Sequence, residues 1–291
     1  AEKTYIAGDD DQAIFKWAGA DVDHFIALKE EVNDIKILDQ SYRIPGGPIH
    51  ELSQNIINKV QNRFQKEYKP REEQGLLKRY SDITQVDMSL GNWLVLSSAN
   101  YFLEDAKDLC EIQGWYYQCK GINSVPLKLL LALNNWEHWR KGDLLNHLEI
   151  KNIYEYLGSS VLPGFQKGKT LHSDAKYTLK ECQEQHGLIA SDVWYNSFEG
   201  LDPMTETYIR NMRANGETLN KNPRIKMSTI HAAKGGEADN VLLMQDLTGA
   251  ALETFSHDPD ELHRLFYTGA TRAKRELHVL DPKNFDRAYI I

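Results

Sequence analysis

Trp93-Leu94-Val95-Leu96 is a short run of bulky apolar residues, and it decides the fold class of this 291-residue chain. Such a run, bounded by polar residues, is typical of a strand that is buried on both faces. A helical pattern over Glu104 to Ile112 follows it, and Trp115 to Cys119 predicts another strand. Strands that alternate with helices predict an α/β fold with a parallel sheet.

The same alternation extends toward both ends of the chain. Thr4 to Ala7 and Ile35 to Leu38 are candidate strands, while Ala20 to Glu30 and Ile49 to Val60 carry apolar residues at helical spacing. Three more apolar runs predict strands near the other end, at residues 225–230, 241–244 and 277–280. Between residues 121 and 221 the pattern is polar and helical instead, which predicts a helical insertion into one sheet domain.

The composition excludes several classes of protein. Charged residues make up 26% and hydrophobic residues 41%, as in ordinary globular proteins. No apolar run approaches the roughly 20 residues that cross a bilayer, so we expect no membrane span. The formal charge of −8 argues against binding of nucleic acid through bulk positive charge, although a local basic groove is compatible with it. The 3 cysteines form no CxxC pair, so we expect a reducing, cytoplasmic location.

One segment partly resembles a phosphate-binding loop. Gly164 to Thr170 ends in Gly-Lys-Thr, but three residues separate its glycines where the Walker A motif has four. The segment also lies in the helical region, with no predicted strand before it. We therefore interpret it as a surface loop.

A second segment imitates a metal site. His257, Asp258 and His263 lie close together in the sequence, but the two histidines lack a third ligand at a recognised spacing. Asp258 is better explained as the N-cap of a helix with Pro259 at its first position. We expect no metal site here, and we expect Arg272 to lie on this helix.

Four polar clusters follow one another along the chain. They are Gly8-Asp9-Asp10-Asp11-Gln12-Ala13-Ile14-Phe15-Lys16-Trp17-Ala18-Gly19-Ala20, Leu38-Asp39-Gln40-Ser41-Tyr42-Arg43, Thr229-Ile230-His231-Ala232-Ala233-Lys234-Gly235-Gly236-Glu237 and Tyr267-Thr268-Gly269-Ala270-Thr271-Arg272-Ala273-Lys274. In this order they resemble the third to sixth motifs of the UvrD/Rep/PcrA-type superfamily-one DNA helicases. The resemblance implies a RecA-like second lobe with a helical insertion. The implied segments are 1–44 (the end of the first lobe), 45–120 and 222–291 (the second lobe) and 121–221 (the insertion).

The resemblance also implies an ATP site. Its catalytic residues would be Gln12, Arg43 and Arg272, and its ATP-binding residues would be these three with Tyr42, Gly235 and Glu237. An arginine at the γ-phosphate contributes about 10³–10⁵ in rate. Tyr42 would stack on adenine, and Glu237 would accept from the ribose hydroxyls. Without the resemblance, each arginine could be a surface ion-pair partner, and Tyr42 a half-buried aromatic at a strand end.

For DNA, the resemblance implies contacts from Phe15, Trp17, Asn100 and His231. Stacking of a base on an aromatic ring contributes about 1–3 kcal/mol and tolerates any sequence, as a translocating motor requires. The alternatives are that Trp17 packs in the core and that His231 is a buried histidine with satisfied hydrogen bonds. In the family's third motif the acids corresponding to Asp9–Asp11 mostly fix a turn, so we expect no metal there.

The family's Walker A lysine and its Mg²⁺-binding acids lie upstream of the third motif, and no residue here matches them. The sequence also begins Ala1-Glu2-Lys3 without an initiator methionine. We therefore expect the C-terminal fragment of an ATP-dependent 3′→5′ helicase that uses ATP and Mg²⁺, with the metal ligands in the missing first lobe. Its partners would be single-stranded DNA, duplex junctions and that lobe, and the fragment alone would not hydrolyse ATP. The alternative is a helicase-like module without ATPase activity, which binds DNA or acts as a scaffold in a repair or replication complex.

Overall fold

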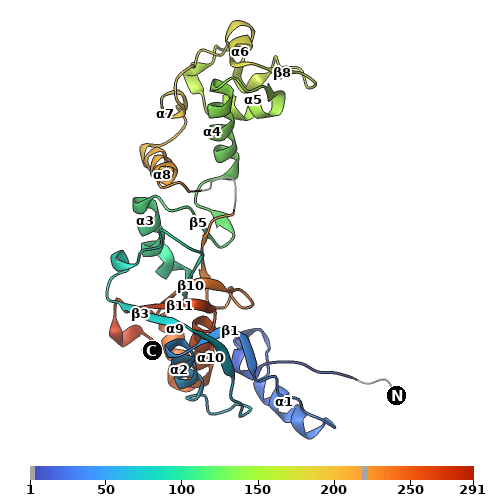
Figure 1. The fold of residues 1–291 in the computed structure, drawn as a ribbon, viewed down its shortest axis with the longest axis vertical. Helices are drawn as coiled ribbons and strands as arrows, with labels where there is room; N and C mark the ends of the chain where they lie inside the picture. Colours follow the sequence, from blue (N-terminus) through green and yellow to red (C-terminus); the bar gives the residue numbers. More distant parts are fainter. Residues whose placement is uncertain (1–3, 218–221) are drawn as a thin grey trace. The chain divides into compact units, whose positions relative to one another are not determined.

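The computed structural model describes residues 4–217 and 222–291, which form two compact units. The first unit combines the chain up to Leu109 with Arg224–Ile291, and the second comprises Cys110–Pro223. Figure 1 labels most of the helices and several of the strands of both units. Among the described residues, no helix is both long and apolar enough to span a membrane.

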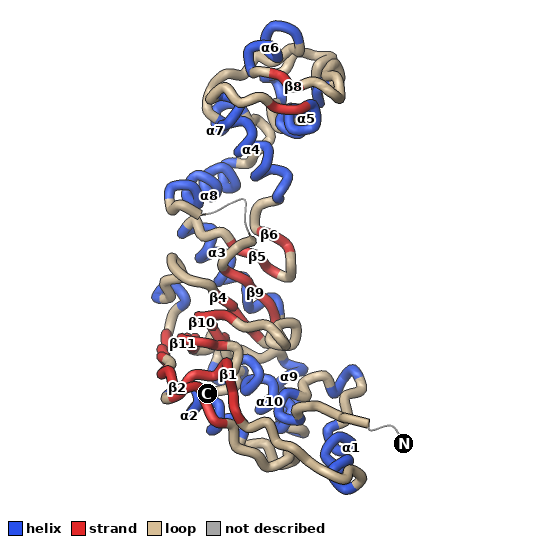
Figure 2. Tube along the Cα trace, turned by 45° about the vertical axis from the view of Figure 1, so that its right-hand side comes forward, coloured by secondary structure: helices blue, strands red, loops and turns tan. Residues whose placement is uncertain are grey.

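A parallel sheet forms the centre of the first unit, and Figure 2 shows its strands in red. Neighbouring strands follow the order β3 (Leu76–Tyr80), β11 (Ala273–Leu280), β10 (Ala238–Met244), β4 (Trp93–Ser97) and β9 (Ile225–Thr229). Each neighbouring pair in this order is parallel. Every residue of β4 is buried. The strands predicted from apolar runs at 93–96, 225–230, 241–244 and 277–280 are therefore confirmed, and the fold is of the α/β class.

Helices α2 (Pro48–Ile57) and α10 (Pro259–Ala270) pack against each other and contribute to the core beside the sheet. Alternate sheet residues such as Leu94, Leu96, Val241 and Leu243 meet apolar residues of these helices. The other helices of this unit are α1 (Val22–Ala27), α9 (Gly249–His257) and α3 (Glu104–Gln113), and the boundary with the second unit falls inside α3. The helices predicted over 20–30, 49–60 and 104–112 are confirmed.

Short 3₁₀ turns connect many of these elements. In the first unit they are η1 (Asp10–Gln12), η2 (Lys16–Ala18), η3 (Leu28–Glu30), η4 (Ile83–Gln85), η5 (Asn100–Leu103) and η8 (Phe285–Arg287). Strand β1 (Gln40–Gly46) pairs in parallel with β2 (Lys69–Gln74) in a separate small sheet. The sequence pattern did not predict β2 or β3, because their residues are largely charged and half exposed.

Two predicted strands are wrong. Thr4 to Ala7 and Ile35 to Leu38 are extended but unpaired among the described residues, and their apolar side chains are exposed. Tyr5 is 86% exposed and Leu38 is 75% exposed. An apolar run forms a strand only where a neighbouring strand accepts its backbone hydrogen bonds. Here the first such pairing begins at Gln40, opposite Lys69.

The second unit is mainly helical. Its helices are α4 (Leu127–Arg140), α5 (His147–Tyr154), α6 (Leu179–Gln185), α7 (Trp194–Ser197) and α8 (Pro203–Ala214). A short hairpin joins β5 (Tyr117–Cys119) to β6 (Ile122–Asn123). Strand β7 (Leu145–Asn146) pairs in antiparallel fashion with β8 (Lys176–Tyr177), which follows only after α5 and two 3₁₀ turns. Its remaining turns are η6 (Gly158–Ser160) and η7 (Gln166–Gly168); the latter lies in the segment that imitates a phosphate loop, and no strand leads directly into it.

Candidate functional site

The chain from Asp9 to Ile14 is fixed to the first unit by buried contacts. Asp9 caps η1 by accepting from the backbone N–H of Asp11, and Ile14 is fully buried in the core. The side chain of Asp11 is also fully buried, and it pairs with Arg63 through Arg63 Nε at 3.0 Å and Nη2 at 2.8 Å. Burial raises the pKa of Asp11. The two parallel hydrogen bonds from Arg63 act in the opposite direction and stabilise the charged carboxylate.

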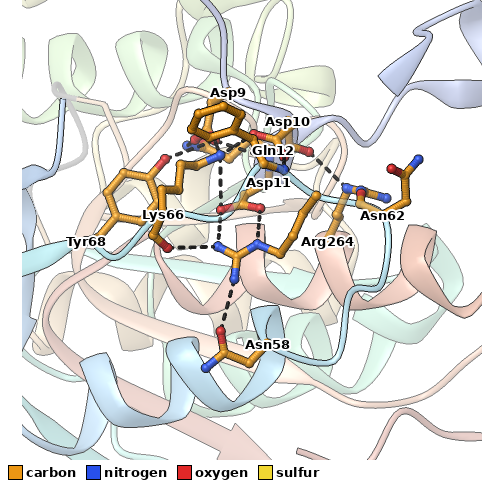
Figure 3. A network of polar contacts seen from close by, with 11 residues as sticks. Asp9, Asp10, Asp11, Gln12, Asn58, Asn62, Lys66, Tyr68 and Arg264 are labelled. Atoms are coloured by element: carbon orange, nitrogen blue, oxygen red, sulfur yellow. Dashed lines mark hydrogen bonds and ion pairs between the residues drawn. The ribbon is translucent and has the colours of Figure 1, made fainter. Parts of the chain in front are cut away.

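Asp10 is held from three sides, as Figure 3 shows in part. Its carboxylate accepts from the backbone N–H of Phe64 at 2.7 Å and forms an ion pair with Lys66. Its backbone carbonyl accepts from Arg264 Nε at 2.9 Å. The acids predicted to fix a turn therefore do so, and they also attach it to α10 and to the segment after α2.

Gln12 and Arg272 come together although they are far apart in the sequence. Arg272 Nη2 donates to Gln12 Oε1 at 2.8 Å, and Gln12 Nε2 donates to Asp9 Oδ2 at 2.5 Å. Arg272 lies just beyond the end of α10 and just before β11, so its predicted position on the helix is wrong. The helix ends at Ala270, and the turn that follows directs Arg272 back toward η1.

Arg272 is 1% exposed, yet all its partners are neutral. Its guanidinium donates through Nε to the carbonyl of Thr268 at 2.9 Å, through Nη1 to the carbonyl of Gly236 at 3.3 Å, and through Nη2 to Gln12. Burial, together with repulsion from Arg43, lowers the pKa of Arg272 to about 10. The side chain therefore stays charged at neutral pH, in a place where a positive charge is costly.

Arg43, on β1, is the second arginine of this site. It is half-buried, its Nε atom has no hydrogen-bond partner, and burial lowers its pKa. In the part of the chain that the structure describes, neither arginine has a carboxylate within ion-pair distance. The alternative interpretation as surface ion-pair arginines is therefore wrong for both. Glu237 and Asp9 attract both arginines only from beyond ion-pair distance. Two neighbouring, partly desolvated cations without a direct ion-pair partner form a site that favours an anion.

A pocket of about 470 Å³ opens beside these groups. Its lining residues are Gln12, Gln40, Ser41, Tyr42, Arg43, Ile44, Tyr68, Glu237 and Tyr267. The ring of Tyr42 is 85% exposed, which contradicts the alternative of a half-buried aromatic. Glu237 is exposed and lies 3.4 Å from Lys274 Nζ, and Gly235 adopts the positive φ of 87° that favours glycine. The pocket thus combines cationic, aromatic and acidic groups.

The acids near this pocket are already occupied. Asp9, Asp10 and Asp11 all contact Lys66 Nζ, and Asp11 also pairs with Arg63. No cluster of three or more metal-ligating side chains occurs within residues 4–217 and 222–291. The residues present therefore fit the phosphates and the nucleoside of a nucleotide better than they fit a metal ion.

Phe15, Trp17 and His231 form a second group. The ring centroid of Phe15 lies 6.0 Å from that of Trp17 and 6.0 Å from that of His231, and Lys234 Nζ lies 5.2 Å from the Phe15 centroid. Trp17 is 73% exposed, so the alternative of core packing is wrong. His231 is half-buried, and burial lowers its pKa, so it is mainly neutral at pH 7. Asn100, which begins η5, is half-buried and makes none of these contacts.

The predicted helix start is confirmed in position, because Asp258 is the N-cap residue of α10 and Pro259 is its first residue, but the capping hydrogen bond is not formed. The carboxylate of Asp258 instead accepts from Lys16 Nζ at 2.5 Å. The next acid, Asp260, accepts from the backbone N–H groups of Gln61 and Asn62 at 2.9 Å each. Both acids therefore bind segments that are distant in the sequence. Helix-capping patterns consider only neighbouring residues, so they could not predict these contacts.

Several residues of the site could not be identified from their own sequence pattern. They are Arg63, Lys66, Tyr68, Arg264 and Tyr267. One signal was available, because three consecutive aspartates next to an apolar residue require cations from elsewhere in the chain. That signal indicates that partners exist, but it does not indicate which of the 34 lysines and arginines they are.

Residues 197–282 match the family model of the UvrD-like helicase C-terminal domain. This part of the chain is therefore similar to the C-terminal domain of UvrD-like helicases, which supports the resemblance seen in the sequence. The matched range includes His231, Gly235, Glu237 and Arg272, whereas Gln12 and Arg43 lie outside it. A search among curated proteins found no match.

Proposed function

We propose that this chain is the C-terminal part of an ATP-dependent 3′→5′ DNA helicase, with a RecA-like lobe that is interrupted by a helical insertion at 121–221. One observation carries the proposal. Arg43 and Arg272 are two neighbouring, partly desolvated cations that have no carboxylate within ion-pair distance among the described residues. Arg272 donates to the amide of Gln12, and Arg43 lines the same pocket as Gln12. Within a helicase-type domain, a polyphosphate is the anion that suits such a site.

The chemistry that these residues would perform is charge stabilisation. Negative charge spreads over the γ-phosphate oxygens as phosphoryl transfer proceeds, and a guanidinium at that point stabilises it. Arg43 and Arg272 would supply that charge, and Gln12 would orient the γ-phosphate or its attacking water. Mg²⁺ would neutralise the β- and γ-phosphate oxygens, held by ligands in the first lobe.

Two other groups that line the pocket suit a nucleoside. The exposed ring of Tyr42 can stack on a base, and the carboxylate of Glu237 can accept from ribose hydroxyls. Gly235, two residues earlier, allows the left-handed turn that precedes Glu237.

The DNA contacts would be Phe15, Trp17, His231 and Asn100. Phe15 and Trp17 follow Gln12 within five residues, so a single short segment carries both the ATP sensor and the stacking groups. A change at the γ-phosphate could therefore move the rings that contact single-stranded DNA. This proximity supports coupling between ATP hydrolysis and translocation.

Binding of inorganic tripolyphosphate to the 291-residue chain tests the proposed site by calorimetry. We expect measurable binding without ATP hydrolysis, and we expect Arg43→Gln to weaken it about tenfold or more, because a charge-assisted contact is lost. Arg210→Gln is the matched control, since Arg210 is paired with Glu206 in the second unit. Equal binding by both variants would remove Arg43 from the site, and no binding by the wild type would reject the nucleotide site itself.

Trp17→Ala is expected to weaken binding of an oligo-dT single strand by about 1–3 kcal/mol, because one stacking contact is lost. Fluorescence anisotropy of a labelled oligonucleotide measures this change. Phe285→Ala, which removes another ring that is 65% exposed, should leave the Kd unchanged. An unaltered Kd for a folded Trp17→Ala variant would remove the stacking assignment. Once the first lobe is present, single-strand affinity that is independent of nucleotide would favour the scaffold alternative.

A further inference from the structure

The carboxylate of Asp9 has two oxygens with different surroundings. Oδ1 accepts from Tyr68 OH at 3.0 Å, from Lys66 Nζ at 3.1 Å and from the backbone N–H of Asp11 at 3.2 Å. Oδ2 accepts from Gln12 Nε2 at 2.5 Å. One oxygen is therefore anchored by three donors, and the other is directed at Gln12, as Figure 3 shows.

This arrangement fixes the orientation of the Gln12 amide. With Nε2 toward Asp9, the carbonyl Oε1 faces Arg272 Nη2 at 2.8 Å. The flipped amide would place N–H groups against the guanidinium and a carbonyl against the carboxylate, and both contacts are repulsive. Asp9 thus decides which end of the amide meets the arginine.

The orientation in turn fixes Arg272. Its guanidinium has five N–H groups. Three of them donate to Thr268 O, Gly236 O and Gln12 Oε1. If the amide of Gln12 turned, Arg272 would lose the only one of these acceptors that comes from η1.

We propose that Asp9 is a positioning residue for the phosphate site, that it acts through Gln12 on Arg272, and that Tyr68 holds Asp9 in place. The inference rests on the proposed function, and it adds two residues to which that function assigns no role. Tyr68 suits this part because it lines the same pocket as Gln12 while its hydroxyl reaches Asp9. Lys66 adds a second anchor, because its ammonium pairs with the same carboxylate oxygen of Asp9 at 3.1 Å.

Tyr68→Phe in the 291-residue chain is the test, because it removes one hydroxyl and changes no charge. The first readout is the side-chain amide signal of Gln12 in a ¹⁵N–¹H spectrum, assigned as the pair that is missing from Gln12→Glu. The second readout is the half-saturation concentration for tripolyphosphate. Tyr117→Phe is the matched control, since Tyr117 OH also donates to a carboxylate, that of Glu111 at 2.7 Å in the second unit.

We expect Tyr68→Phe to shift the Gln12 amide signal and to raise the half-saturation concentration about three- to tenfold, while Tyr117→Phe changes neither. Asp9→Asn should shift the same signal, because the acceptor is then uncharged. An unmoved Gln12 signal in both variants, or a moved signal with unchanged tripolyphosphate affinity, overturns the positioning role. If the wild-type chain binds no tripolyphosphate, the proposed function fails separately, and the amide signal alone decides the inference.

Discussion

In the proposed ATP-dependent helicase, with its first lobe present, Arg272→Lys is expected to lower DNA-stimulated ATP turnover by about 10³-fold or more, at the lower end of the range for an arginine finger. Lysine keeps the charge, but it has a single ammonium in place of a planar fork. In the structure three different nitrogens of Arg272 contact three acceptors, so one ammonium cannot reproduce the arrangement. The loss should appear in kcat, because the stabilised charge develops in the transition state.

The measurement is steady-state ATP hydrolysis with saturating single-stranded DNA, and the control is Arg275→Lys. Arg275 is three residues further on in β11 and is exposed, so its variant should turn over ATP like the wild type. Because Arg272 is almost fully buried, the thermal unfolding midpoint must be compared as well. A folded Arg272→Lys variant with wild-type kcat would exclude the arginine from catalysis.

The predicted site residues and the predicted strands rest on different kinds of sequence information. Gln12, Arg43 and Tyr42 were proposed from the order of motifs, and the structure places them around one pocket. Glu237 also lines that pocket, and Arg272 reaches it through its hydrogen bond to Gln12. No periodicity of the sequence could have shown this, because the contacts join segments separated by up to 260 residues.

The strands depend on their surroundings to different degrees. The run at residues 93–96 is buried on both faces, so its apolar residues alone identify it. Strand β2 is charged and half exposed, and it forms because β1 lies beside it. Thr4 to Ala7 is the opposite case, because it has the composition of a strand but forms none, since it has no neighbouring strand among the described residues. Local pattern therefore predicted the centre of the sheet better than its edges.

Arg63→Ala is expected to destabilise the first unit by about 3–5 kcal/mol, the range for breaking a buried ion pair. The side chain of Asp11 is 0% exposed and that of Arg63 is 1% exposed, so the variant leaves a carboxylate without its main partner and without water. Lys66 Nζ remains 3.3 Å from Asp11, so the carboxylate keeps one cationic neighbour and the loss of stability is limited. Hydrogen exchange of peptides from β4 and β10 reports the stability of this unit separately from that of the second unit.

Two further variants test whether the loss of stability in Arg63→Ala arises from the unpaired charge of Asp11. Lys16→Ala breaks an ion pair whose side chains are 63% and 33% exposed, so we expect a change below about 1 kcal/mol. Combining Arg63→Met with Asp11→Leu removes both charges at once, and we expect it to cost less than Arg63→Ala alone, because no buried charge remains unpaired. A double variant as unstable as the sum of its single changes would mean that Arg63 and Asp11 act independently. Arg63 would then stabilise the unit through its contacts with Asn58 and with the carbonyl of Lys66, and not through its pairing with Asp11.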